Sequence, residues 1–364
     1  MAAISITKWI ILSLNMFIIL TLTHAQQVPC LFIFGDSQSD NGNNNPLITK
    51  AKANYPPYGV DFPGAIPTGR FTNGKNIPDC LAEFLELRDP IPPFAAAEGP
   101  PALLKGVNYA SGAAGILDSS GRNLGDRLCM KKQLENHKAT IAQIAPLLGN
   151  QTSADAYLNQ CLYVVNIGSN DYINNYFQQP PSPSNSLTPE AFADEVIAAF
   201  STQLKSLYEL GSRKVAVFGV GLIGCIPQEI LLYPITNGSP CVDDSNIAVG
   251  IFNGKLVSLI KELNTKLPNA QFTYINVTSI ALGGPGPAGV TEVNDPCCEV
   301  QKAGDPAPGQ CLPNGAVCEN RDQYIFFDNF HPTEISNIFT ASRAYRAFLP
   351  TDASPVDIEH LVRK

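Results

Sequence analysis

The sequence is poor in charge, in histidine and in tryptophan. Charged residues make up only 15% of the 364 residues, whereas hydrophobic residues make up 45%. Disordered chains show the opposite balance, so disorder is excluded. The 24 Lys and Arg are outnumbered by 32 Asp and Glu and form no basic block, which argues against nucleic acid or an anionic membrane surface as a partner.

Long hydrophobic runs are absent beyond the N-terminus. Lys8 precedes an apolar run over residues 9–20, and Thr23-His24-Ala25 then offers small residues at the −3 and −1 positions of a cleavage site. The run is too short to span a bilayer comfortably, so a membrane anchor is the weaker alternative. We predict a signal peptide over residues 1–25 and a secreted chain that forms a single domain over residues 26–364.

The cysteine content agrees with secretion. All ten cysteines lie beyond residue 25, and an even number in an oxidising compartment favours disulfides. Paired Cys-x-x-Cys spacing is absent and histidine is scarce, so we expect no metal site. We also expect no cofactor. The cysteines between residues 297 and 318 lie in a stretch rich in Gly and Pro, where disulfides would hold a loop that has no core of its own.

Three sequons predict N-glycosylation of a secreted chain. They begin at Asn150, Asn237 and Asn276. Sequons also arise by chance, but three of them make at least one used site a reasonable expectation.

Short apolar runs alternate with helical patterns along the chain. Runs without polar alternation, as expected for buried parallel strands, occupy residues 30–34, 162–167, 215–218 and 272–275. Helical periodicity occurs at residues 134–148, 188–211 and 251–268, with Thr188 as an N-cap. This order predicts an α/β fold with a parallel sheet, whose ligands bind beyond the carboxyl ends of the strands.

Two of the four histidines are candidates for a catalytic base. His24 leaves with the signal peptide, and His137 lies in a helical pattern without an acidic partner, which favours a core or surface role. His331 and His360 each follow an aspartate by three residues. The spacing alone does not separate these two pairs.

The surroundings of the two pairs favour Asp328 and His331. They follow an aromatic run, residues 324–327, that we expect to be a buried segment. Asp357 and His360 instead lie within the last eight residues, where chains commonly fray. We therefore predict that His331, and not His360, is the base.

A nucleophile and oxyanion donors can be placed at predicted strand ends. Gly35-Asp36-Ser37 ends the first run, and serine becomes a nucleophile when a histidine takes its proton and a carboxylate orients that histidine. Asn170 follows the second run, and Gly112 offers a backbone N–H; such groups can stabilise a tetrahedral oxyanion. Taken singly, each of these segments reads equally well as an ordinary turn or loop.

Together these segments resemble the plant-type GDSL esterase/lipases of the SGNH hydrolase superfamily. The resemblance covers nearly the whole chain beyond residue 25. It is carried by Phe34-Gly35-Asp36-Ser37, Tyr55-Pro56-Pro57-Tyr58-Gly59, Pro67-Thr68-Gly69-Arg70-Phe71-Thr72-Asn73-Gly74-Lys75, Gly106-Val107-Asn108-Tyr109-Ala110-Ser111-Gly112, Gly168-Ser169-Asn170-Asp171-Tyr172 and Asp328-Asn329-Phe330-His331-Pro332.

The resemblance implies a three-layer α/β/α fold with a mostly parallel, flavodoxin-like sheet. It implies Ser37 as nucleophile, His331 as base and Asp328 as the acid that orients it. The oxyanion hole would comprise the N–H groups of Ser37 and Gly112 and the Asn170 side chain, with Gly115 as second choice for the glycine. Gln38 stands where the family usually has leucine, which affects packing beside the nucleophile and not the chemistry.

The implied activity is hydrolysis of a small-molecule or lipid carboxylic ester through an acyl-enzyme. An acyltransferase would use the same residues, with an alcohol in place of water. A catalytically silent extracellular binding protein is the alternative of another class, and the intact Ser37, Asn170, Asp328 and His331 argue against it. Residues 178–189, rich in proline, favour a surface loop over a mobile lid.

Overall fold

The computed structural model describes residues 26–87, 89–97, 99–178, 183–233, 235 and 238–363. The predicted signal peptide, the sequon at Asn237 and residues 179–182 of the proline-rich stretch lie outside these residues. Within the described residues, no helix has the length and apolar character needed to cross a membrane.

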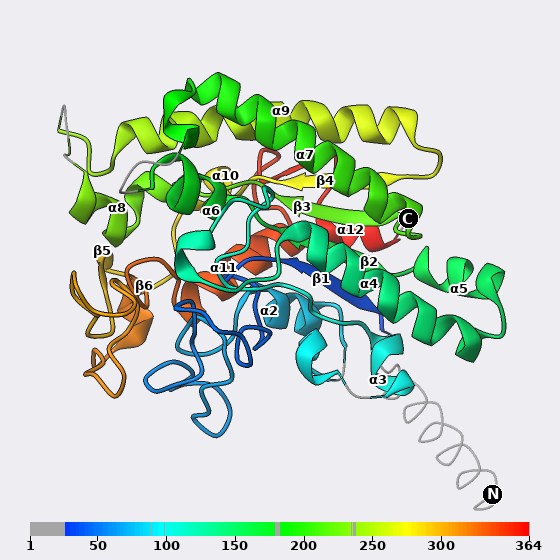
Figure 1. Ribbon diagram of the computed structural model, residues 1–364, viewed down its shortest axis with the longest axis horizontal. Coiled ribbons are helices and arrows are strands. Elements are labelled where there is room, and N and C mark those ends of the chain that lie inside the picture. Colours follow the sequence, from blue (N-terminus) through cyan, green and yellow to red (C-terminus); the bar gives the residue numbers. More distant parts are fainter. Residues whose placement is uncertain are drawn as a thin grey trace, which may run out of the picture.

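A five-stranded sheet forms the centre of the fold (Figure 1). Its order is β1 (Leu31–Gly35), β2 (Leu162–Asn166), β3 (Lys214–Phe218), β4 (Gln271–Ile275) and β7 (Ala353–Ser354). All neighbouring pairs are parallel except the last. Residues 107–111 extend the sheet beside β1 through backbone hydrogen bonds to Ile33 and Gly35, which completes the flavodoxin-like order.

Helices cover both faces of the sheet, as the lack of alternation in the strands predicts. Side chains such as Phe32, Phe34 and Tyr163 pack on the side of α4 (Met130–Ile144), α7 (Pro189–Glu209) and α9 (Asp243–Lys266). Their neighbours in the strands pack on the side of α2 (Ile77–Phe84), α11 (Glu334–Tyr345) and α12 (Ile358–Arg363). The fold is therefore the expected three-layer α/β/α arrangement (Figure 1).

Shorter elements lie mainly around the carboxyl ends of the strands and in the connections. They are α3 (Pro100–Lys105), α5 (Gln151–Leu158), α6 (Ser169–Asp171), α8 (Pro227–Leu232), α10 (Val277–Leu282), β5 (Glu292–Pro296) and β6 (Tyr324–Phe326). Strands β5 and β6 form a separate parallel pair.

The predicted strands and long helices are present. Their boundaries shift by up to four residues, except that α9 begins at Asp243, eight residues before the predicted start. Thr188 caps α7 by accepting a hydrogen bond from the Ala191 N–H, as its position before Pro189 predicts. His137 lies in the core on α4, where burial lowers its pKa to about 3. It is therefore a core residue.

Two expectations about the C-terminal part were wrong. The tail does not fray, because Ile358, Leu361 and Val362 of α12 are buried against the sheet. The run before Asp328 is only half-buried over residues 324–326, and Phe327 alone is fully buried. These residues form β6, a strand of the small sheet, and not a core strand.

Eight of the ten cysteines are paired. The disulfides are Cys30–Cys161, Cys225–Cys241, Cys297–Cys318 and Cys298–Cys311, while Cys80 and Cys129 are free. Two of the disulfides close residues 297–318, which we call the disulfide loop. The loop has more core than expected, because Cys297, Cys298 and Cys311 belong to a small apolar cluster that also contains aromatic side chains.

Two sequon asparagines cap helices. Asn150 and Asn276 accept hydrogen bonds at Oδ1 from the backbone N–H groups of Ser153 and Ser279. Each therefore uses its acceptor oxygen, and the Nδ2 that would carry a glycan is not the capping atom. Glycosylation of either residue stays a prediction.

Candidate active site

Ser37 lies directly after β1, at the carboxyl edge of the sheet. The turn requires glycine at position 35, because a Cβ there would lie 2.6 Å from the carbonyl oxygen of Asn166 on the neighbouring strand. This close approach brings the ends of β1 and β2 together. The residues after both strands therefore meet at one place.

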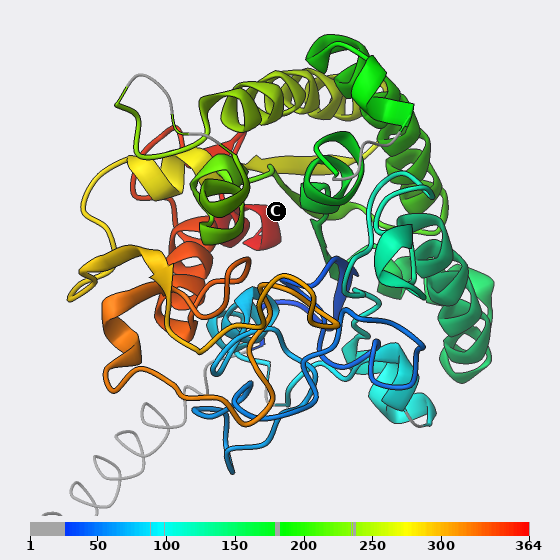
Figure 2. The same cartoon turned by 60° about the vertical axis from the view of Figure 1, so that its left-hand side comes forward.

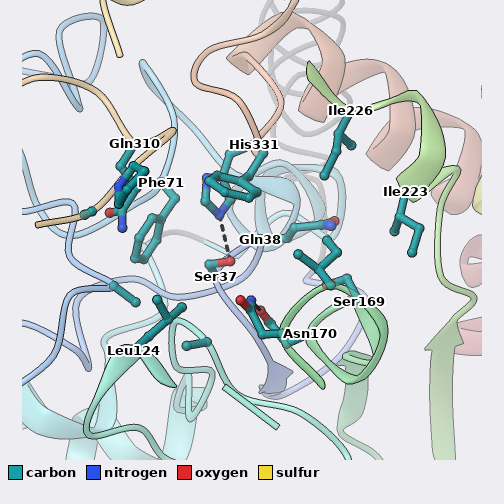
Figure 3. Close-up of a pocket in the computed structure, with 17 residues that line it drawn as sticks. Ser37, Gln38, Phe71, Leu124, Ser169, Asn170, Ile223, Ile226, Gln310 and His331 are labelled. Atoms are coloured by element: carbon teal, nitrogen blue, oxygen red, sulfur yellow. Dashed lines mark hydrogen bonds between the residues drawn. The ribbon is translucent and has the colours of Figure 1, made fainter. Parts of the chain in front are cut away.

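Ser37, His331 and Asp328 form a continuous hydrogen-bonded row. Nε2 of His331 lies 2.7 Å from Oγ of Ser37 (Figure 3). Nδ1 of His331 lies 2.8 Å from Oδ2 of Asp328. Asp328 is fully buried. A carboxylate beside Nδ1 keeps the proton on that nitrogen, so Nε2 is free to accept the proton of Ser37.

The second Asp-x-x-His pair repeats the local geometry but not the surroundings. In both pairs the aspartate Oδ1 accepts the backbone N–H of the histidine and lies near Nδ1. The His360 side chain is 60% exposed, compared with 9% for His331. It lies on α12, and only His331 contacts Ser37.

Asp36 links the nucleophile turn to the segment that carries Asn170. Its Oδ2 accepts the Ser169 hydroxyl at 2.6 Å, and its Oδ1 accepts the Gln38 N–H at 3.0 Å. Burial raises the pKa of Asp36, while the bond from Ser169 opposes that rise. This carboxylate holds Ser37 and Asn170 side by side (Figure 3).

Three N–H groups at the site remain available to a developing oxyanion. Asn170 Nδ2 gives one proton to the Ala114 carbonyl at 3.0 Å, and its second proton has no acceptor within the described part of the chain. The backbone N–H groups of Ser37 and Ala113 likewise have no acceptor among the described residues. Both residues line the pocket. N–H groups without a protein acceptor that line a pocket can donate to a bound group.

The structure places Gly112 and Gly115 differently from the prediction. The Gly112 N–H donates to Oδ2 of the buried Asp40 at 3.0 Å, so it is directed away from the pocket. An added Cβ on Gly115 would lie 2.8 Å from the Asp171 carboxylate, and Gly115 is not a pocket-lining residue. The neighbouring Ala113, with a positive φ of 65°, lines the pocket instead.

The pocket around Ser37 is mainly apolar and has two walls. Phe71 and Leu124 lie on one side of Ser37, and Ile223 and Ile226 lie on the other (Figure 3). No Asp, Glu, Lys or Arg lines the pocket in the described part of the chain. The site therefore suits an uncharged substrate with apolar groups on both sides of the reacting bond.

Sequence reasoning missed the aromatic residues around the triad. The Phe71 ring lies 4.8 Å from the His331 ring, centroid to centroid. The Tyr58 hydroxyl contacts Asp328. Both residues belong to the segments that carry the family resemblance, which was the available signal, but their contacts arise only in the tertiary structure.

Ser37, His331 and the buried Asp328 are hydrogen-bonded one after the other at the carboxyl edge of a three-layer α/β/α sheet, an arrangement that occurs in serine hydrolases. Comparison with known proteins agrees. The GDSL-like lipase/acylhydrolase family model matches residues 31–344. The chain belongs to this family, and it is a carboxylic ester hydrolase.

Several plant relatives match over almost their whole length. The chain is 44% identical to GDSL esterase/lipase At1g29670 of Arabidopsis thaliana, over 98% of this chain and 99% of the relative. It is 45% identical to At5g45670 of the same organism, over 92% of each chain. It is also 45% identical to At4g30140, over 93% of this chain and 92% of the relative.

Proposed function

We propose that the protein is a secreted serine esterase that hydrolyses uncharged carboxylic esters through an acyl-enzyme. The contact between His331 Nε2 and Ser37 Oγ, with Asp328 on the other ring nitrogen, is the observation that carries the proposal. Secretion is supported by the signal-like residues 1–25, by the disulfides and by the sequons at Asn150, Asn237 and Asn276. Residues 26–364 would form one catalytic domain.

Acylation uses the row of three side chains. Ser37 Oγ attacks the ester carbonyl carbon while its proton passes to His331 Nε2, and Asp328 stabilises the imidazolium that forms. The tetrahedral intermediate collapses when the carbon–oxygen bond to the alcohol breaks. His331 gives its proton to the departing alkoxide, and the acyl group stays on Ser37.

Deacylation repeats these steps with water as the nucleophile. In both tetrahedral intermediates the oxyanion is held by the Ser37 N–H and by the second proton of Asn170 Nδ2. The Ala113 N–H takes the place expected for Gly112, because the Gly112 N–H is already bonded to Asp40. Donors of this kind act strongly because they are fixed before charge develops.

The absence of charged lining residues supports uncharged esters as substrates. A charged acyl group or head group would lose its hydration in this pocket without gaining an oppositely charged Asp, Glu, Lys or Arg partner among the described lining residues. The two apolar walls instead provide contacts for aliphatic groups on either side of Ser37. Hydrolysis and acyl transfer would use the same residues. We propose hydrolysis because it is the simpler of the two and needs water in place of an alcohol.

The test is turnover of p-nitrophenyl esters of increasing chain length by the wild type and by Ser37→Ala. We expect the wild type to release p-nitrophenol and Ser37→Ala to lose at least 10³-fold in kcat. Labelling with a fluorophosphonate, followed by mass spectrometry, should place the adduct on Ser37. Turnover that survives in Ser37→Ala would refute the mechanism, and ester products formed with an added alcohol would favour the acyltransferase.

A further inference from the structure

We propose that Tyr58 is a positioning residue of the proposed active site, where its phenol fixes the Asp328 carboxylate that orients His331. The inference rests on the proposed function and names a fourth member of the hydrogen-bonded row. Tyr58 does not touch the reacting atoms, so it acts through Asp328.

The phenol donates a short hydrogen bond into the row. Tyr58 Oη lies 2.5 Å from Asp328 Oδ2, and both side chains are buried. The direction of the bond is determined by a second contact, because Tyr58 Oη accepts the backbone N–H of Cys311 at 3.1 Å. The hydroxyl proton is therefore directed to Asp328. Burial, and next the negative Asp328, raise the pKa of Tyr58 well above its ordinary value, so the phenol stays protonated.

Asp328 depends on this donor because it has no access to water. Its Oδ1 accepts the backbone N–H groups of Phe330 at 2.8 Å and His331 at 2.7 Å. Its Oδ2 has only the His331 ring and the Tyr58 phenol as partners in the described part of the chain. Removal of the phenol would leave Oδ2 of this buried carboxylate with the His331 ring as its one remaining donor in the described part of the chain, and the loss of a hydrogen bond to a buried charge carries a substantial free-energy cost.

The disulfide loop holds Tyr58 in place. Cys311, whose N–H binds the phenol, is joined by a disulfide to Cys298. The Cys298 N–H in turn donates to the Phe327 carbonyl at 2.8 Å, directly before Asp328. One disulfide thus connects both ends of the Tyr58–Asp328 bond. Figure 2 shows this loop, in orange, beside the blue segment that carries Tyr58.

Three titratable groups of the described residues interact electrostatically with the Asp328–His331 pair. Tyr58 and Tyr55 interact with Asp328, and Asp36 interacts with His331. Loss of the Tyr58 donor removes a hydrogen bond from the ionised Asp328, whose negative charge then attracts a protonated His331 more strongly. The acidic limb of the pH–rate profile reports this attraction.

The test is Tyr58→Phe, which removes the hydroxyl and keeps the ring. We expect kcat on a p-nitrophenyl ester to fall by about 10- to 100-fold with KM within about twofold, the size expected for a bond to a charged group. The acidic limb of the kcat/KM profile should move to higher pH. A purely structural role would not move this limb.

Tyr55→Phe is the matched control. Tyr55 packs edge-on against Tyr58, and its hydroxyl binds the carbonyl of the same Cys311 at 3.0 Å, but it makes no hydrogen bond to Asp328. We expect kcat within about twofold of the wild type and an unchanged acidic limb. If both variants showed equal losses, the effect would come from loosening of the disulfide loop, and the inference would be overturned.

Two further measurements test the inference, and the second, with fluorotyrosine, does not depend on the folding of Tyr58→Phe. In an Asp328→Asn background, Tyr58→Phe should cost less than twofold more, because the carboxylate is already absent. Incorporation of 3-fluorotyrosine at position 58 leaves the ring in place and makes the phenol a stronger donor, so the acidic limb should move to lower pH. Additive losses, or a limb that does not move with fluorination, would contradict the inference.

The two proposals fail in distinguishable ways. If Ser37→Ala keeps activity, the proposed serine mechanism fails whatever Tyr58→Phe does. If Ser37→Ala is inactive while folded Tyr58→Phe matches the wild type in kcat and in pH profile, the mechanism stands and only the role of Tyr58 is refuted.

Discussion

The two Asp-x-x-His pairs allow a direct test of the proposed base, because the chain carries its own control. We consider His331→Ala and His360→Ala. Both substitutions remove an imidazole that binds an aspartate three residues earlier. Only His331 also lies within hydrogen-bonding distance of Ser37 Oγ, at 2.7 Å.

The expected magnitudes differ by orders of magnitude. His331→Ala leaves Ser37 without a proton acceptor and leaves Asp328 buried without its cationic partner in the transition state. We expect kcat to fall by roughly 10⁴- to 10⁶-fold, or about 5–8 kcal/mol of transition-state stabilisation. His360→Ala removes a side chain that is 60% exposed and that does not contact Ser37. We expect its kcat within about twofold of the wild type.

The assay is hydrolysis of a p-nitrophenyl ester, with circular dichroism and thermal unfolding as controls for folding. Ser37→Ala and the double variant Ser37→Ala/His331→Ala should be no more impaired than His331→Ala alone, because these residues act as a unit. A folded His331→Ala enzyme that retains activity, together with an inactive His360→Ala enzyme, would refute the assignment of the base.

Four further predictions concern the rest of the molecule. Asn170→Ala removes one preorganised oxyanion donor, so kcat should fall by about 10²- to 10³-fold with little change in KM; near-native kcat would exclude Asn170 from the oxyanion hole. Burial raises the pKa of Glu229 from 4.5 to about 7, so the stability it contributes is complete below about pH 4.5 and is lost as pH rises through about 7. Glu229→Gln should therefore unfold a few degrees above the wild type at pH 8 and show a smaller gain at pH 5, as measured by calorimetry; an equal difference at both pH values would contradict the raised pKa. Replacement of Cys298 and Cys311 by serine removes a disulfide that spans 13 residues. The free energy of unfolding in urea titrations should fall by about 2–3 kcal/mol. An unchanged urea midpoint would disprove this loss. Trp9 is the only tryptophan, so secreted protein cleaved after residue 25 should show tyrosine emission alone, and indole emission would indicate that the segment is retained.

Local sequence signals were sufficient to predict the layers of the fold. Continuous apolar runs predicted β1 to β4, because parallel strands covered on both faces need no polar alternation. The pattern around Thr188 predicted the start of α7, because capping depends on neighbouring residues. The short β7, the β5–β6 pair and α12 were missed. Each depends on contacts with distant parts of the chain and has little periodicity of its own.

The candidate site shows the same division. The Asp-x-x-His spacing produces the contact between the aspartate carboxylate and the histidine Nδ1 in both pairs. The sequence alone therefore did not distinguish the two pairs. Contact with Ser37, 294 residues away, exists for only one of them. The donation of the Gly112 N–H to Asp40, the contact of Tyr58 with Asp328 and the Cys30–Cys161 disulfide are likewise contacts between segments far apart in the chain. The sequence by itself determined which residues could do the chemistry, because motifs are local. The tertiary structure alone decided which of them meet, because that depends on how the strands, α11 and the disulfide loop pack together.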